Sequence, residues 1–175
     1  KTIDPQRIQL AVIEIVQRMG YAGIAILAFI ENLFPPIPSE VIMPLAGYHA
    51  SQGEMSLAGA IASGAAGSFA GCVGWYFIGR RINESRLRSF AERHGRWLTL
   101  SNEDIDKVHD WFHRHGGPVV FFGRLVPGLR TWVSLPAGLH EMSFVPFVLF
   151  TLAGTTLWTT ALTWAGYWLG EQYWG

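Results

Sequence analysis

The feature that most constrains this chain is an apolar run that contains two arginines and a break. Residues 119–142 read VVFFGRLVPGLRTWVSLPAGLHEM, with Arg124 and Arg130 on either side of Pro127 and Gly128. Proline lacks a backbone N–H and clashes with the preceding turn, so one continuous helix through this stretch is not expected. Each apolar arm has about 10 residues, whereas a helix that crosses a bilayer needs about 20. The pattern therefore predicts a re-entrant hairpin, which enters a membrane, breaks and leaves on the side where it entered.

The two arginines are the first candidates for a functional site. A charged side chain at membrane depth is costly and marks a functional site by default. The guanidinium group keeps its charge and offers a fork of donors that suits phosphate or carboxylate. We therefore expect Arg124 and Arg130 to bind an anionic group. The alternative, in which both side chains reach the headgroups and only anchor the loop, stays open.

The composition agrees with a membrane protein. Of the 175 residues 50% are hydrophobic and 15% are charged, whereas charged residues make up about 25% of a typical soluble domain. The mean hydropathy is +0.23 and the chain has 8 Trp, as in proteins with several membrane helices and interfacial aromatics. The formal net charge is zero, so nucleic acid is not an expected partner. The single cysteine, Cys72, excludes an internal disulfide and a multi-cysteine metal site, and we expect neither metal nor cofactor.

A second broken segment lies near the N-terminus. Residues 21–34 are apolar except for Glu31 and Asn32, and prolines follow at 35, 36 and 38 before Glu40. No helix continues through Pro35, Pro36 and Pro38, so residues 21–52 are predicted to form a first re-entrant hairpin. A short spanning helix over 21–34 stays open as the alternative.

The remaining segments are read from their hydrophobic pattern. Residues 1–20 predict an amphipathic surface helix that ends at Gly20. Residues 56–79 and 143–172 are apolar and long enough to cross a membrane. Residues 80–116 are rich in arginine, which places them in the cytoplasm; they should contain two surface helices, the second ending at Gly116.

The two halves of the chain resemble each other. In the first half, the string Pro44-Leu45-Ala46-Gly47 precedes Met55-Ser56 and a crossing helix; in the second, Pro136-Ala137-Gly138 precedes Met142-Ser143 and another. Each half holds one re-entrant hairpin (21–52 or 117–142) and one crossing, so the second half is inverted relative to the first. The predicted fold is a single all-α integral membrane domain, residues 1–175, built as an inverted repeat of two opposed re-entrant hairpins, each followed by a transmembrane helix. Such repeats are the plan of many transporters, which bind substrate where the breaks meet.

The two breaks carry opposite charges. Glu31 and Glu40 flank the first, and Arg124 and Arg130 flank the second. A carboxyl group in a low-dielectric site exchanges protons closer to neutral pH, and a neighbouring arginine opposes its protonation. Binding of an anion to the arginines would relieve that effect, which links proton and anion binding. The alternative is a pair of static Glu–Arg contacts that hold the hairpins together.

These strings resemble a known family. The E-x3-P-P-x-P-x-E string of residues 31–40 is similar to the first signature of the DedA family of bacterial membrane proteins, and the F-x-G-R-x-x-P-x-x-R-T string of residues 121–131 is similar to the second. The resemblance implies the VTT (SNARE-associated Golgi protein) domain shared with eukaryotic lipid scramblases. It also implies transport of lipid phosphates in the inner membrane, notably undecaprenyl phosphate, with dependence on the proton-motive force in some members. By position, Glu31, Glu40, Arg124 and Arg130 match the family's essential acids and arginines.

The expected function is therefore a proton-coupled flippase for an anionic lipid phosphate in the bacterial inner membrane, not an enzyme. Its expected partners are a polyprenyl phosphate or phospholipid and protons, and both a monomer and a homo-oligomer are open. The alternatives are a passive phospholipid scramblase, an ion–proton exchanger and, last, a membrane lipid phosphatase, which would need a nucleophile held by a base.

Several other side chains have weaker signals. His109 and His113 have the i,i+4 spacing of metal ligands, but a surface helix is the favoured interpretation. Trp111 and Phe112 are expected to face lipid, and His49 and His140 are expected to be exposed at the interface.

Overall fold

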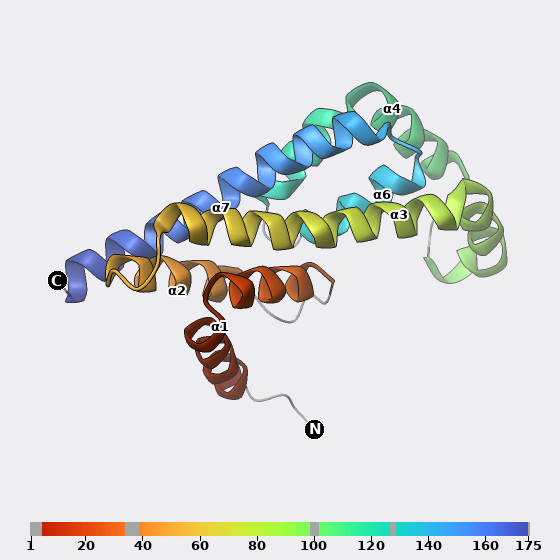
Figure 1. The fold of residues 1–175 in the computed structure, drawn as a ribbon. Coiled ribbons are helices and arrows are strands. Elements are labelled where there is room, and N and C mark those ends of the chain that lie inside the picture. Colours follow the sequence, from red (N-terminus) through yellow and green to blue (C-terminus); the bar gives the residue numbers. More distant parts are fainter. Residues whose placement is uncertain (1–4, 34–38, 99–101, 127–128, 175) are drawn as a thin grey trace. The chain divides into compact units, whose positions relative to one another are not determined.

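The computed structural model describes residues 5–33, 39–98, 102–126 and 129–174, which contain helices and turns but no strand (Figure 1). The helices are α1 (Pro5–Leu33), α2 (Ser39–Ser51), α3 (Leu57–Leu98), α4 (Asn102–Leu125), α5 (Leu129–Trp132), α6 (Ser134–Leu139) and α7 (Phe144–Trp174). The chain divides into two compact units: unit 1 holds Lys1–Gly71 and Thr155–Gly175, and unit 2 holds Cys72–Gly154. The predicted all-α class is confirmed.

Three of the described helices are long and apolar enough to cross a membrane. The candidate spans are Ile13–Leu33 in α1, Leu57–Ile82 in α3 and Phe144–Gly170 in α7. The last two contain the two crossings that the sequence predicts. The first joins the end of the predicted surface helix to the first arm of the predicted hairpin.

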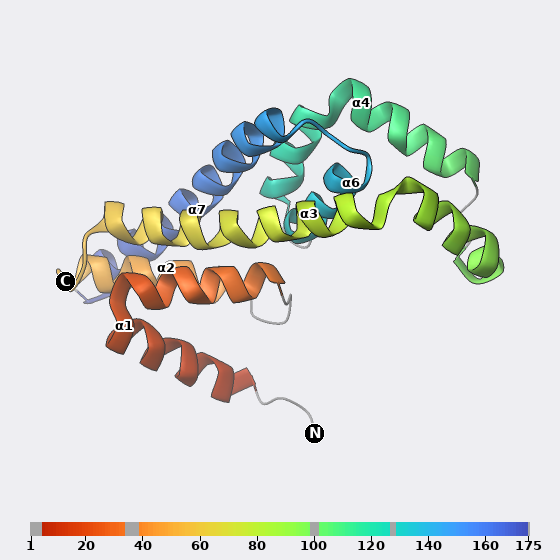
Figure 2. The same cartoon turned by 45° about the vertical axis from the view of Figure 1, so that its right-hand side comes forward.

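Helix α1 is kinked at Gly20, where φ is 54° and ψ is −127°. Residues other than glycine rarely adopt this backbone conformation. Gly20 therefore lets α1 turn sharply between the arm before it and the arm after it (Figures 1 and 2). The arm after the kink, residues 21–33, is about 20 Å long, whereas the hydrocarbon core of a bilayer is about 30 Å thick. This arm alone is too short to cross.

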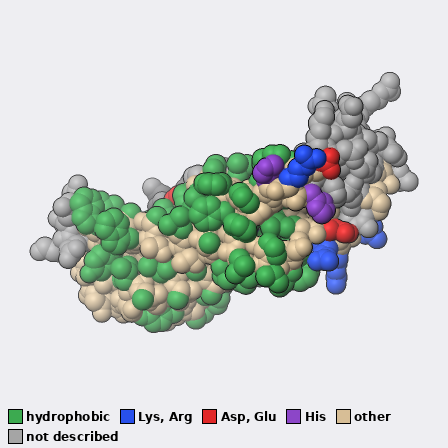
Figure 3. Space-filling view, turned by 90° about the horizontal axis from the view of Figure 1, so that it is seen from above, with side chains coloured by type: hydrophobic (Ala, Val, Ile, Leu, Met, Phe, Trp, Pro, Cys, Tyr) green, Lys and Arg blue, Asp and Glu red, His purple; other side chains and the backbone are tan. Residues whose placement is uncertain are grey.

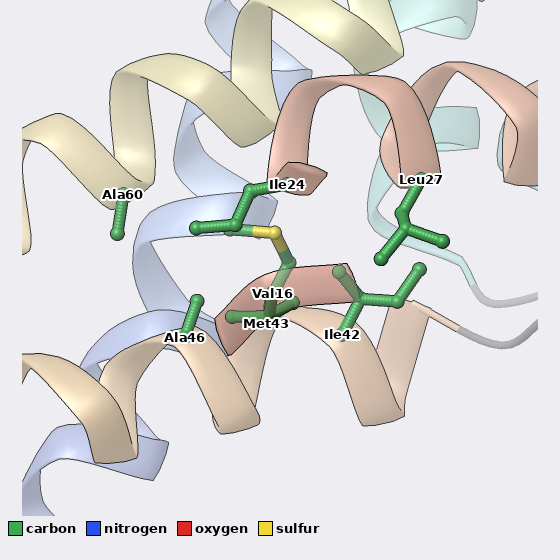
Figure 4. Packing of buried hydrophobic residues seen from close by; sticks show 7 residues of the cluster. All are labelled: Val16, Ile24, Leu27, Ile42, Met43, Ala46 and Ala60. Carbon is green, nitrogen blue, oxygen red and sulfur yellow. The ribbon is translucent and has the colours of Figure 1, made fainter. Parts of the chain in front are cut away.

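The core of unit 1 joins α1 to α2, which lie side by side in both views (Figures 1 and 2). Apolar side chains from these two helices point toward one another, with one alanine from α3 beside them (Figure 4). The cluster is Val16, Ile24, Leu27, Ile42, Met43, Ala46 and Ala60. Val16 precedes the kink, so the amphipathic arm also contributes to the core of this unit.

In unit 1, α2 packs against the end of α7 through two glycines. A Cβ at Gly47 would collide with the carbonyl oxygen of Thr163 and lie 2.8 Å from the backbone nitrogen of Tyr167. A Cβ at Gly166 would collide with the backbone of Pro44. Because the obstructing atoms are backbone, the two helices approach this closely only with glycine at both positions.

In unit 2, α6 makes the same kind of contact with α3. A Cβ at Gly138 would collide with the carbonyl oxygen of Tyr76 and lie 3.0 Å from the backbone nitrogen of Arg80. A Cβ at Gly79 would collide with the carbonyl oxygen of Leu135. Each unit thus pairs the glycine that ends one of the small-residue strings (residues 44–47 and 136–138) with a glycine of a long helix: Gly47 with Gly166 of α7, and Gly138 with Gly79 of α3. The contacted residues lie at the same offsets from these glycines in both units.

Two expectations about helix ends and one about exposure are wrong. Gly116 does not end a helix, because α4 runs on to Leu125. Residues 80–98 are not a separate surface helix, because α3 continues through them from Leu57. Phe112 does not face lipid: it is 7% exposed and belongs to the core of unit 2. Trp111 is exposed, as expected.

The surface of the described residues is mostly hydrophobic. Large exposed apolar side chains occur on α1, α3 and α7, among them Ile26, Phe77, Leu149 and Trp164. On the face seen in Figure 3, hydrophobic side chains are spread widely among other side chains and backbone, and most of the charged and histidine side chains lie toward the right of the view. Such an extensive apolar surface is typical of helices that face lipid.

Candidate functional site

Arg124 lies in the last turn of α4 and is the most deeply buried arginine of the described residues, with 2% of its surface exposed. Its Nη1 donates a hydrogen bond to the carbonyl oxygen of Arg130 at 2.7 Å and another to the sulfur of Cys72. Its Nη2 donates to the hydroxyl of Ser134. The guanidinium group therefore ties α4 to the residues that follow the predicted break.

One donor of this guanidinium group is not used in that network. The Nε atom of Arg124 is buried and has no hydrogen-bond partner among the described residues. A buried donor without a partner costs about 1–3 kcal/mol, so an acceptor that reached it would be favoured.

Arg130 lies in α5 and is 9% exposed. Its backbone carbonyl accepts from Arg124, and the residue has a further interaction within the protein. The structure thus brings Arg124 and Arg130 into direct contact, as the sequence suggests, but gives the two arginines different environments.

Close packing fixes the position of Arg124 relative to α7. A Cβ at Gly154 would lie 2.8 Å from the Cβ of Arg124 and 3.1 Å from the carbonyl oxygen of Phe121. A similar contact occurs in unit 1, where a Cβ at Gly71 would lie 2.6 Å from the Cβ of Asn32 and 3.2 Å from the carbonyl oxygen of Phe29. Arg124 and Asn32 therefore make similar contacts, each with its Cβ beside a glycine of another helix.

The two acids lie in unit 1 and differ in burial. Glu31 is in the last turn of α1, is 3% exposed and interacts with other groups of the protein. Glu40 is in the first turn of α2 and is exposed. The acids belong to unit 1, whereas Arg124 and Arg130 belong to unit 2. Their expected juxtaposition therefore stays a prediction.

The residues of the two breaks lie outside the described part of the chain. These are Pro35, Pro36 and Pro38 of the first break and Pro127 and Gly128 of the second. The helices on either side end and begin where the sequence predicts a break: α1 ends at Leu33 and α2 begins at Ser39, while α4 ends at Leu125 and α5 begins at Leu129.

The two histidines that follow the small-residue strings are buried, contrary to the expectation of exposure. The Nδ1 atom of His49 lies 2.5 Å from Oε2 of Glu54, and its Nε2 is buried without a hydrogen-bond partner among the described residues. His140 stacks on Phe112 with ring centroids 5.6 Å apart. Within the described ranges no cluster of three or more His, Cys, Asp or Glu side chains could hold a metal ion.

Sequence reasoning missed two partners of Arg124. Cys72 is buried and accepts a hydrogen bond from Arg124, and Ser134 is fully buried as another acceptor. The only signal for Ser134 was a hydroxyl within an apolar run, which is weak because such residues also bond to their own helix.

The fold and the buried arginines define a helical membrane protein with a charged, hydrogen-bonded group at a helix break. Residues 37–168 match the model of the VTT domain. The chain belongs to this family, the DedA family that its two signatures resemble.

Three relatives are similar to this chain over most of its length. Undecaprenyl phosphate transporter A of Staphylococcus aureus is 37% identical over 160 residues, covering 91% of this chain and 79% of the relative. A protein of the same name from Bacillus subtilis is 36% identical over 89% of this chain and 74% of its own. An "alkaline phosphatase-like protein" of Lactococcus lactis subsp. lactis is 37% identical over 94% of this chain and 78% of its own. No solved structure matches the chain.

Proposed function

We propose that this protein is a flippase that moves an anionic lipid phosphate across the bacterial inner membrane. Undecaprenyl phosphate is the first candidate for that lipid. The observation that carries the proposal is the buried pair Arg124 and Arg130 at the break between α4 and α5. A charge at membrane depth marks a functional site by default, and the guanidinium group offers a fork of donors that suits a phosphate. The names of the Staphylococcus and Bacillus relatives support a polyprenyl phosphate as that anion.

In this proposal the two arginines have different roles. Arg124 holds the break in shape, because its Nη1 and Nη2 atoms already bond to Cys72, Arg130 and Ser134. Arg130, held in the short helix α5, is the main ligand of the phosphate. The unused Nε of Arg124 offers a further donor to the same phosphate.

The proposed architecture is an inverted repeat with residues 21–52 and 117–142 as re-entrant hairpins. The short arm over 21–33 and the matching glycine contacts of Gly47 and Gly138 support it. In this arrangement residues 80–116 lie in the cytoplasm, the first hairpin opens outward and the second opens inward. Opposed broken helices give a substrate two routes to one site, as alternating access requires.

Glu31 and Glu40 are the proposed proton carriers. The burial of Glu31 in the last turn of α1, away from solvent, supports this role. Proton uptake at Glu31 would then accompany arrival of the phosphate at the arginines. A passive scramblase would use the same arginines without this coupling.

A lipid phosphatase is the competing function, favoured by the name of the Lactococcus relative. The two functions differ in their products. The protein, reconstituted into vesicles that contain undecaprenyl phosphate on one leaflet, should transfer the intact lipid to the other leaflet and release no inorganic phosphate. Release of phosphate in step with loss of the lipid would overturn the proposal in favour of an enzyme.

A further inference from the structure

A pocket of about 250 Å³ lies in unit 2, apart from the Arg124 network. It is enclosed by the middle of α4, the turn after α6 and the beginning of α7. Four basic side chains line it: His113, Arg114 and His115 from α4, and His140 from the turn. Arg114 and Arg124 are ten residues apart in one helix, which corresponds to about 15 Å.

The packing around the pocket gives it a fixed shape. A Cβ at Gly117 would collide with the ring of Phe150, and one at Gly116 would lie 3.3 Å from the sulfur of Met142. The hydroxyl of Tyr76 donates to the carbonyl oxygen of Met142 at 2.5 Å. These contacts bring the start of α7 against the basic stretch of α4, so the cavity does not depend on a flexible loop.

The lining offers hydrogen-bond donors that suit an anion. The titratable groups that face the pocket are His113, Arg114 and His115 on α4 with His140 and Glu141 in the turn; the lining residues of α7, Pro146 and Phe150, do not titrate. Arg114 and Glu141 carry opposite charges, and the N–H groups of the three histidine rings are further donors for an anionic oxygen. The first backbone N–H groups of α7, beside the pocket, add a weaker attraction for negative charge.

The surroundings indicate that the anion belongs to a lipid. Trp111, Phe144 and Val145 are exposed next to the residues that line the pocket. Tryptophan is enriched at the level of the headgroups, where its ring contacts lipid and its N–H contacts water. A free phosphate ion would need the basic groups but would make no use of this apolar border.

We infer that this pocket binds the phosphate of an anionic lipid at the membrane surface, as a second site in addition to the arginines at the break. Arg114 supplies a fork of donors to the phosphate oxygens, and His115 adds a further donor. Binding here does not require transport, so the inference stands or fails independently of the proposed flippase activity. An equilibrium titration tests it without any gradient.

The full chain in detergent micelles would be titrated calorimetrically with dihexanoyl phosphatidic acid, dihexanoyl phosphatidylcholine and inorganic phosphate. The double variant Arg114→Gln, His115→Gln should weaken phosphatidic acid binding about tenfold or more, the loss expected for charge-assisted hydrogen bonds. The exposed Arg86 of α3 provides the control, and Arg86→Gln should leave the affinity unchanged. The comparison is repeated in an Arg130→Lys background, so that binding at the break does not mask the pocket.

A gain of affinity separates binding from folding. Glu141→Gln removes the one acidic side chain of the lining and should tighten phosphatidic acid binding, which a folding defect cannot imitate. An unchanged affinity in the double variant, or equal weakening by Arg86→Gln, would overturn the inference. Inorganic phosphate that binds as tightly as phosphatidic acid would overturn its assignment to a lipid.

Discussion

The guanidinium group of Arg124 donates a hydrogen bond to the backbone carbonyl of Arg130 across the break between α4 and α5, with 2.7 Å between Nη1 and the carbonyl oxygen. The side chain of Arg124 thus helps to position the backbone of Arg130. This relationship predicts that replacing one or the other has different consequences.

Arg124→Lys should destabilise the protein. Lysine keeps the charge, but its single ammonium group cannot reach Cys72, Ser134 and the Arg130 carbonyl together in the fork geometry. We expect a loss of about 1.5–3 kcal/mol, the size of a hydrogen bond to a charged group, measured by thermal unfolding in detergent. Arg86→Lys on the exposed part of α3 is the control, and equal stability of both variants would contradict the network.

The glycine contacts can be tested as a matched pair. Gly47→Ala and Gly138→Ala each place a methyl group against backbone that cannot move aside. Both should lower the free energy of unfolding, by about 1–3 kcal/mol for overpacking. A methyl group at Gly74 would meet no atom within 4 Å, so Gly74→Ala should be neutral or stabilising by up to about 1 kcal/mol. Tolerance of alanine at Gly47 but not Gly138 would argue against equivalent contacts in the two units.

The inverted arrangement predicts opposite exposure of the two hairpin ends. Gln52 and Glu141 are exposed residues that follow α2 and α6. In a Cys72→Ser background, Gln52→Cys should react with an impermeant thiol reagent applied to intact spheroplasts, and Glu141→Cys should react only after lysis. Serine keeps an acceptor for Arg124 in this background. Labelling of both positions from the same side would exclude the inverted repeat.

Glu31→Gln and Glu40→Gln test the proton coupling. Glutamine keeps the shape of the side chain and removes its ionisation, so transport by these variants should no longer respond to an imposed pH gradient. If the acids only hold the fold together, Glu31→Gln should instead destabilise the protein, by about 3–5 kcal/mol for a broken buried ion pair. Undiminished gradient dependence in both single variants and the double variant would leave a passive scramblase.

The sequence predicted the helical class, the crossings and the two breaks, because length, apolar runs and prolines fix these features locally. It could not predict whether a glycine ends a helix or makes room for a neighbour. The pattern predicts a helix end at Gly116, yet Gly116 and Gly117 make room for Met142 and Phe150, which are distant in the sequence. Burial of His140 on Phe112 depends on the same distant packing.

The sequence predicts the charged residues of the candidate site but not their hydrogen-bond partners. Arg124 and Arg130 stand out because charge in an apolar run is costly. Cys72 and Ser134 do not stand out, since small polar residues are common in packed helices. Only the folded chain brings them to the same guanidinium group.

The measurement that tests the central claim most directly is the flux of undecaprenyl phosphate in reconstituted vesicles, for the wild type and for Arg130→Lys. Thermal unfolding establishes that both proteins are folded, and phosphatidylcholine serves as the zwitterionic control lipid. We expect the wild type to move undecaprenyl phosphate much faster than phosphatidylcholine, and Arg130→Lys to lose most of that flux because lysine cannot bind the phosphate with two parallel hydrogen bonds. Wild-type flux of the lipid phosphate in a folded Arg130→Lys variant would contradict the account.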